Sequence, residues 1–118
     1  MDNIHCYLGN TVIDGERKRG WFCGEFINPE SICNDKVIET KWGIHKIGEC
    51  CDWKSSTKSK TMAILLNGSF LIELRNSSYE RRYELNNEGD YLVWDENYQH
   101  RWKAISNSKI ITIRWTLT

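Results

Sequence analysis

Two histidines, His45 and His100, are the side chains in this 118-residue sequence with the most informative chemistry. An imidazole can bind a metal ion, accept a proton or contact a ligand near neutral pH. Two imidazoles with a carboxylate such as that of Glu49 can hold iron or zinc, so His45 and His100 are candidate metal ligands. The competing interpretation is a core histidine that is hydrogen-bonded inside the fold. Along a strand, side-chain alternation places Trp102 on the same face as His100.

The five cysteines predict neither a disulfide framework nor a zinc site. Their number is odd, and none is spaced as Cys-x-x-Cys. The adjacent Cys50 and Cys51 would point to opposite faces of a strand, which makes a shared metal difficult. We therefore expect reduced thiols.

The elements that must position these side chains are predicted to be strands. From Thr61 onward, stretches rich in β-branched and aromatic residues alternate with turn residues, which is typical of an all-β fold. Asn67-Gly68 predicts a tight hairpin between Met62–Leu66 and Ser69–Arg75. After a turn at Asn76-Ser77-Ser78, further strands are expected at Tyr79–Leu85, Tyr91–Trp94, Gln99–Ala104 and Ile110–Leu117. This spacing indicates an antiparallel sandwich or barrel, and a jelly roll fits the count.

The composition excludes several classes of protein. Sixteen basic side chains balance 16 acidic ones, whereas nucleic-acid binders usually carry a basic excess. No apolar run approaches the roughly 18–20 residues that cross a bilayer, and Met1–Asn10 lacks the apolar stretch of a signal peptide. We expect one cytoplasmic domain over residues 1–118, with neither a nucleic-acid nor a membrane partner. Lys36–Ile47 is expected to hold one or two strands, and Trp53–Lys60, with its lysines, a solvated loop.

The segment Gly89–Ala104 resembles the second motif of the cupin superfamily, G-x5-P-x-G-x2-H-x3-N. Gly89 and His100 have the expected spacing, whereas Asp95, Asn97 and Ala104 stand where Pro, Gly and Asn are usual. The resemblance implies an antiparallel double-stranded β-helix, the cupin jelly-roll barrel, with His100 pointing into the barrel. It also implies a homodimer, because cupins frequently pair.

The first cupin motif, G-x5-H-x-H-x3,4-E-x6-G, is degenerate in this sequence. With Gly68 as its last glycine, Thr61 occupies the place of the glutamate ligand, and Lys54–Ser59 contains no histidine. The usual ligands of this motif are therefore absent. We therefore favour a protein without a cofactor. The alternative is a protein that binds a divalent metal (Zn, Fe, Mn or Ni) at His45 and His100.

Five short segments narrow the resemblance. In order, they are KWGIH (41–45), GSF (68–70), GDYLVW (89–94), HRW (100–102) and IRW (113–115). They resemble a family of small stand-alone cupin-like proteins common in cyanobacteria, over about residues 39–117. Some of its members carry a signal peptidase I label, which would imply a membrane anchor and a Ser/Lys dyad on a larger catalytic domain, and we expect neither the anchor nor such a domain in this sequence.

These residues support three hypotheses about function. The first is a non-catalytic protein that binds a small molecule, sugar-like or a small acid, through His100, Trp102, His45 and Trp42. Arg114, on the polar face of its strand, either lies in solvent or anchors an acidic ligand. The second is a cupin enzyme: a metal-dependent oxygenase, isomerase or lyase, or a metal-free epimerase with His100 as base. The third is a structural or regulatory dimer whose pocket is closed by its own tryptophans.

Overall fold

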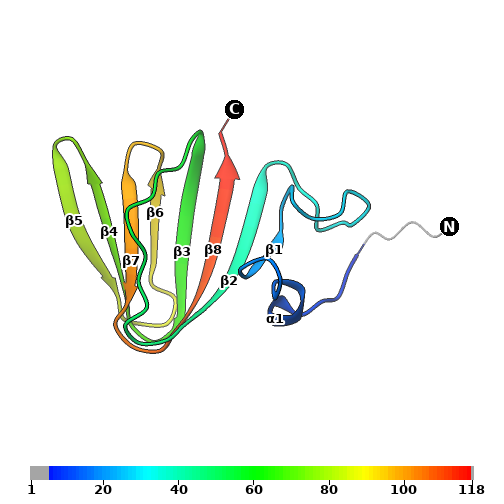
Figure 1. Ribbon diagram of the computed structural model, residues 1–118, viewed down its shortest axis with the longest axis horizontal. Helices are drawn as coiled ribbons and strands as arrows, with labels where there is room; N and C mark the ends of the chain where they lie inside the picture. Colours follow the sequence, from blue (N-terminus) through cyan, green and yellow to red (C-terminus); the bar gives the residue numbers. More distant parts are fainter. Residues whose placement is uncertain (1–5, 118) are drawn as a thin grey trace.

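Two antiparallel sheets form the molecule, as the all-β interpretation predicts. The computed structural model describes residues 6–117. One sheet has the strand order β1-β2-β8-β3-β6 and the other the order β5-β4-β7, and Figure 1 shows β5 and β1 at opposite ends of the fan of strands. The elements are α1 (Thr11–Asp14), β1 (Trp21–Cys23), β2 (Ile38–His45), β3 (Ser59–Asn67), β4 (Phe70–Asn76), β5 (Tyr79–Leu85), β6 (Tyr91–Asp95), β7 (Gln99–Ala104) and β8 (Ser108–Thr116).

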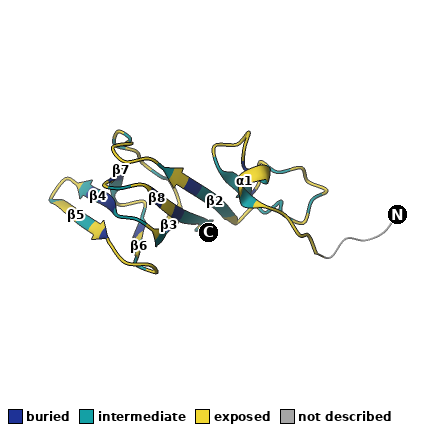
Figure 2. Cartoon of the chain, turned by 90° about the horizontal axis from the view of Figure 1, so that it is seen from below, coloured by how far each residue is buried: buried dark blue, intermediate teal, exposed yellow. Residues whose placement is uncertain are grey.

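The hydrophobic core lies between the facing sides of the two sheets. Leu65 of β3 is fully buried, and Phe70 and Ile72 of β4 are 3% and 2% exposed. Burial of each such side chain stabilises the fold by about 1.5–3 kcal/mol. The short helix α1 contributes no buried residue, and Figure 2 shows it in the colour of exposed residues. The core is therefore formed by the strands from β3 to β8.

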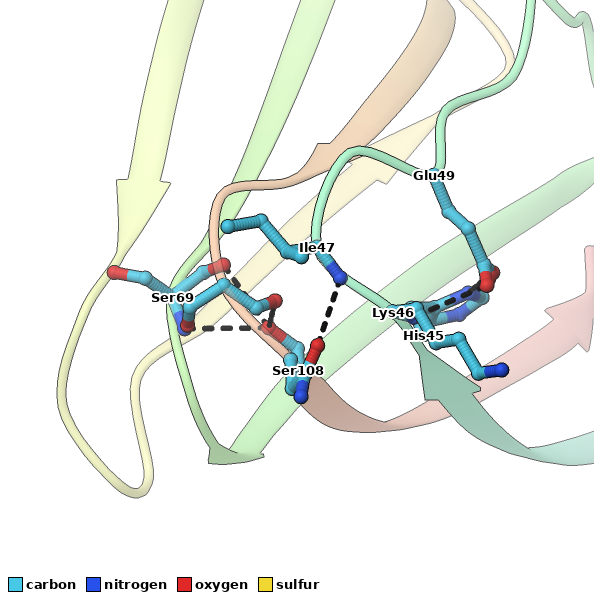
Figure 3. A network of polar contacts seen from close by, with 8 residues as sticks. His45, Lys46, Ile47, Glu49, Ser69 and Ser108 are labelled. Carbon is cyan, nitrogen blue, oxygen red and sulfur yellow. Dashed lines mark hydrogen bonds and ion pairs between the residues drawn. The ribbon is translucent and has the colours of Figure 1, made fainter.

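The turn at Asn67-Gly68 corrects the predicted hairpin. The two strands exist, but β3 and β4 belong to different sheets and do not pair. Gly68 has a φ of 99°, and a Cβ there would meet the carbonyl oxygen of Asn107. The Ser69 N–H donates to the hydroxyl of Ser108 at 3.2 Å (Figure 3), which fixes the corner where the chain changes sheet.

The other predicted strands are confirmed. β4 and β5 form a hairpin in which Asn76 and Tyr79 are partners, and β7 covers Gln99–Ala104 as expected. The single strand β2 accounts for the strand-like segment Lys36–Ile47. All five cysteines are free, and none of the helices in the described range 6–117 is long and apolar enough to cross a membrane.

The inner face of β8 is the more polar one. Its residues Ile110, Thr112 and Arg114 are register partners of Leu65, Ala63 and Thr61 on β3, all of which are buried. Partners in an antiparallel pair share a face of the sheet. Arg114 therefore points between the sheets, and Ile111 and Ile113 lie on the outer face.

Candidate functional site

A cavity of about 210 Å³ lies between the two sheets. Its apolar wall consists of Phe70, Ile72, Trp94 and Ile110. Drug-sized ligands usually occupy pockets of roughly 300–1,000 Å³, so this cavity suits a smaller molecule. An adjoining, more open pocket of about 330 Å³ is lined in part by the same side chains. Together they make one continuous candidate site.

His100 of β7 lies at the junction of the two pockets and lines both. His100 is 8% exposed, and the centroid of its ring is 5.1 Å from the ring centroid of Trp94. Burial, followed by the positive charges of Arg114 and Lys54, lowers the pKa of His100 from 6.5 to about 4. The imidazole is therefore neutral at pH 7.

Several buried polar atoms in the cavity wall have no hydrogen-bond partner among the described residues. They are Nδ1 of His100, Nε of Arg114, Oγ1 of Thr61 and Nε1 of Trp94. A buried polar group without a partner costs about 1–3 kcal/mol. All four residues line one cavity, which makes a polar molecule bound there a candidate partner for these atoms.

His45 of β2 lies in a different part of the cavity wall. Its ring centroid is 4.3 Å from that of Trp102 and 5.4 Å from that of Phe70. On its other side, Nδ1 is 3.4 Å from a carboxylate oxygen of Glu49 (Figure 3). Burial lowers the pKa of His45, and the hydrogen bond with Glu49 acts in the opposite direction. The ring is held by stacking and by one carboxylate.

Positive charge is supplied to the cavity by the five-stranded sheet. Lys41 of β2 and Arg114 of β8 both line it, and both approach the ring of Trp21 of β1. The Lys41 Nζ is 5.7 Å and the Arg114 Cζ is 5.0 Å from the ring centroid, within the range of cation–π attraction. Trp21 therefore helps to hold the two cations in place.

Lys54 reaches the cavity because its segment pairs with β7. Its N–H donates to the carbonyl of His100 at 2.8 Å, and the N–H of His100 donates to the carbonyl of Lys54 at 2.9 Å. The neighbouring Trp53 contacts two guanidinium groups, with its ring centroid 4.0 Å from the Cζ of Arg75 and 4.5 Å from that of Arg101. The loop expected at Trp53–Lys60 is thus anchored at its start, and Lys54 lines the cavity instead of being only a solvated side chain.

The structure brings together four of the five predicted ligand-binding residues. His100, Trp102, His45 and Arg114 all line the cavity, whereas Trp42 lines only a neighbouring depression beside α1, which shares Arg19, Lys41, His45 and Trp102 with the cavity. Trp42 is three positions from His45 on the same strand, and an odd spacing places two side chains on opposite faces.

Among the cavity residues that sequence reasoning missed, four carry the positive charge of the wall or contact it. They are Arg19, Trp21, Lys41 and Lys54. Lys41 could have been found, because its even spacing from His45 puts both on one face of a strand. The other three come from irregular segments or a three-residue strand, for which no period-2 signal exists.

The cavity wall does not fit the divalent metal that the cupin resemblance implies. Within residues 6–117, no three His, Cys, Asp or Glu side chains are grouped as a metal site. Thr61 and Lys54 stand near His100 in place of acidic or imidazole ligands. A divalent cation next to Lys54, Lys41 and Arg114 would be repelled.

Comparison with solved structures places the chain among proteins of cupin-like fold. A conserved protein of unknown function from Streptococcus pyogenes has a TM-score of 0.61 at 15% identity, over 71% of this chain and 68% of that one. A cupin superfamily protein from Desulfitobacterium hafniense has a TM-score of 0.60 at 14% identity, over 71% of each chain. The fold is therefore the cupin jelly roll that the sequence predicted.

A third similar structure contains a metal. The oxalate decarboxylase of Bacillus subtilis, which has Mn(II) centres, gives a TM-score of 0.61 at 13% identity, over 68% of this chain and 21% of that one. Proteins of this fold can thus bind a metal, although the present chain differs at the cavity wall. No family model matches the sequence, and no curated protein matches it.

Proposed function

We propose that this protein binds a small molecule in the barrel cavity, without catalysing a reaction. The observation that carries the proposal is that one cavity is lined by four residues with buried, unpartnered polar atoms, namely His100, Arg114, Thr61 and Trp94. Unpartnered groups of this kind are costly in a closed core and useful in a binding site. Trp102 and His45 complete the proposed contacts.

The low pKa of His100 favours binding over proton abstraction. A general base works best with a pKa near the operating pH. With a pKa of about 4, His100 is a weak base, which disfavours the metal-free epimerase hypothesis. The metal-dependent hypothesis is disfavoured by the cations that face the same ring.

The third hypothesis, a dimer whose pocket is closed by tryptophans, predicts no cavity, and a cavity of about 210 Å³ is present. Homodimer formation stays a prediction of the cupin resemblance. Within the described chain, β1 and β6 are the outermost strands of the larger sheet, and such edges can pair with a second copy. Analytical ultracentrifugation of the full chain tests this prediction.

A thermal-shift screen with neutral sugars and small acids tests the proposed binding. A ligand specific for the folded state raises the melting temperature by mass action. We expect at least one compound to stabilise wild-type protein, and we expect His100→Ala to abolish that shift. Lys103→Ala is the control, because Lys103 is exposed on the same strand outside the cavity. Binding would be refuted if no compound shifted the wild type, or if every shift persisted in His100→Ala.

Metal content, measured on untagged protein purified without chelator, tests the enzyme alternative. We expect less than about 0.1 equivalent of Zn, Fe, Mn or Ni in wild type and in His100→Ala. Metal near one equivalent in wild type, lost in His100→Ala, would favour the metal-dependent enzyme.

A further inference from the structure

The distribution of charge in the cavity differs from that of the whole chain. The protein has equal numbers of basic and acidic residues. The cavity, however, is lined by Arg19, Lys41, Lys54 and Arg114, and by no aspartate or glutamate. Four cations around one cavity without a lining carboxylate create a strongly positive site.

These cations have no ion-pair partner among residues 6–117. The ion pairs of that range join Glu73 to Arg82 and Arg101, and Glu49 to His45. Burial, and then repulsion from Lys54 and Arg114, lowers the pKa of Lys41. The folded state thus holds like charges near one another, and a bound negative charge would relieve their repulsion.

Acidic residues lie at the border of the site, among them Glu49 beside His45 and Glu39 on β2. Glu39 is the register partner of Arg114 and lines the adjoining open pocket, but the two side chains form no ion pair. The guanidinium of Arg114 therefore keeps its donors available, and its planar fork matches the two oxygens of a carboxylate.

The rest of the cavity favours an organic anion over an inorganic one. Phe70, Ile72 and Ile110 form an apolar wall beside the cations. A phosphate or chloride ion would leave this wall in contact with water. A small carboxylic acid would place its charge at Arg114 and its carbon skeleton against the wall, within a volume of about 210 Å³.

We infer that the cavity is a site for a small organic carboxylate, whose negative charge is received by Arg114 and Lys41 with Lys54 at the rim. This inference rests on the proposed binding function and names its ligand class. It distinguishes small acids from neutral sugars. It also gives a role to Trp21, whose ring is approached by the side chains of Lys41 and Arg114.

Matched pairs of probes test the charge of the ligand on wild-type protein. Benzoate and benzamide, and succinate and succinamide, have similar shapes and differ in charge. Binding is measured by isothermal titration calorimetry and by the indole N–H signal of Trp94 in NMR spectra. We expect each carboxylate to bind at least tenfold more tightly than its amide, and we expect inorganic phosphate to leave the Trp94 signal unchanged.

Substitutions test which side chains receive the charge. Arg114→Gln and Lys41→Gln should each weaken benzoate binding at least tenfold. Lys109→Gln removes the same charge from the outer face of β8 and should leave binding unchanged. Glu39→Gln should strengthen it twofold to tenfold, because the negative charge of Glu39 in the adjoining pocket repels a bound carboxylate. Circular dichroism of each variant confirms the fold, and the wild-type probe series needs no variant.

The outcomes of these experiments distinguish the inferred carboxylate ligand from the proposed small-molecule binding on which it rests. Amides or neutral sugars that bind as tightly as carboxylates would overturn the inferred charge and leave small-molecule binding intact. Phosphate that binds as tightly as benzoate would overturn the inference that the ligand is an organic anion. Failure of every charged and neutral probe, here and in the thermal-shift screen, would overturn both.

Discussion

Lys54 and His100 lie directly opposite each other and exchange both of their backbone hydrogen bonds, at 2.8 and 2.9 Å. Because opposite residues in an antiparallel pair share a face, the side chains of Lys54 and His100 lie on the same side, and both line the cavity. This pairing explains how a loop residue contributes to the low pKa of a strand residue.

Replacement of Trp53 is predicted to release Lys54 from the cavity. The Trp53 ring contacts the guanidinium groups of Arg75 and Arg101, and each exposed cation–π contact contributes about 0.5–1 kcal/mol. Trp53→Ala should lower the free energy of unfolding by about 1–2 kcal/mol and should speed hydrogen exchange at the Lys54 amide. Trp53→Phe, which keeps an aromatic face, is the control. Unchanged exchange in Trp53→Ala would show that pairing with His100 alone holds the segment.

Protonation of His100 is predicted to destabilise the fold in acid. Since its folded pKa of about 4 lies below the ordinary 6.5, the unfolded chain binds more protons between these values, and stability falls as the pH drops from 6.5 to 4. A difference of this size corresponds to up to about 3 kcal/mol. The charged side chains that face His100 are Lys54, Arg114, Lys41, Arg19 and Glu39.

Urea unfolding at pH 7.0 and pH 4.5 measures this effect in wild type and in His100→Asn. The loss of stability in acid should be smaller in the variant by about 2–3 kcal/mol. Equal losses in both proteins would mean that His100 titrates alike in the folded and unfolded chains.

Glu49 is predicted to control the pKa of His45 alone. Its carboxylate favours the protonated ring, whereas burial acts against protonation. Glu49→Gln should therefore lower the pKa of His45 further, as measured by NMR titration of the ring carbons. The pKa of His100 serves as an internal control, because Glu49 does not contribute to its shift. If the pKa values of both histidines changed in Glu49→Gln, the effect of Glu49 would not be specific to His45.

Two adjacent residues of β3 are predicted to differ in their contribution to stability. Leu65 is fully buried between the sheets, whereas Ile64 is half-buried on the outer face. Leu65→Ala should cost about 2–5 kcal/mol, including the cavity that it leaves. Ile64→Ala should cost less than about 2 kcal/mol. Chemical denaturation of both variants compares them, and a reversed order would contradict the register of β3.

Local sequence patterns predicted the strands better than their partners. The residues of β7 and the hairpin at Asn76–Tyr79 were predicted correctly, because alternation and turn residues are local properties. Asn67-Gly68 also turns the chain, but turn chemistry does not determine which sheet receives the next strand. That choice depends on nonlocal packing, here at Ser108 and Asn107.

The candidate site was predictable only where alternation could be counted. His100 and Trp102 follow the period of a strand, and both line the cavity. Arg114 lies on the less apolar face of β8, and the sequence could not decide whether that face is inside. Burial of Ile110 and Ala63 on the inner side decides it. The placement of Lys54 in the cavity wall depends on its pairing with His100, 46 positions further along the chain, which no local pattern encodes.

The three-residue strand β1 contributes to the cavity wall but not to the hydrophobic core. Trp21 of β1 and the preceding Arg19 line the cavity, but neither belongs to the hydrophobic core cluster. β1 is bound only to β2, at the edge of the sheet. Substitutions in this short stretch can therefore reshape one wall of the cavity while the barrel stays intact. For a protein engineer, Arg19 and Trp21 are the positions at which to change the cavity wall with little effect on the core, whereas Gly20, with a φ of 92° and the carbonyl oxygen of Trp42 beside it, must stay glycine.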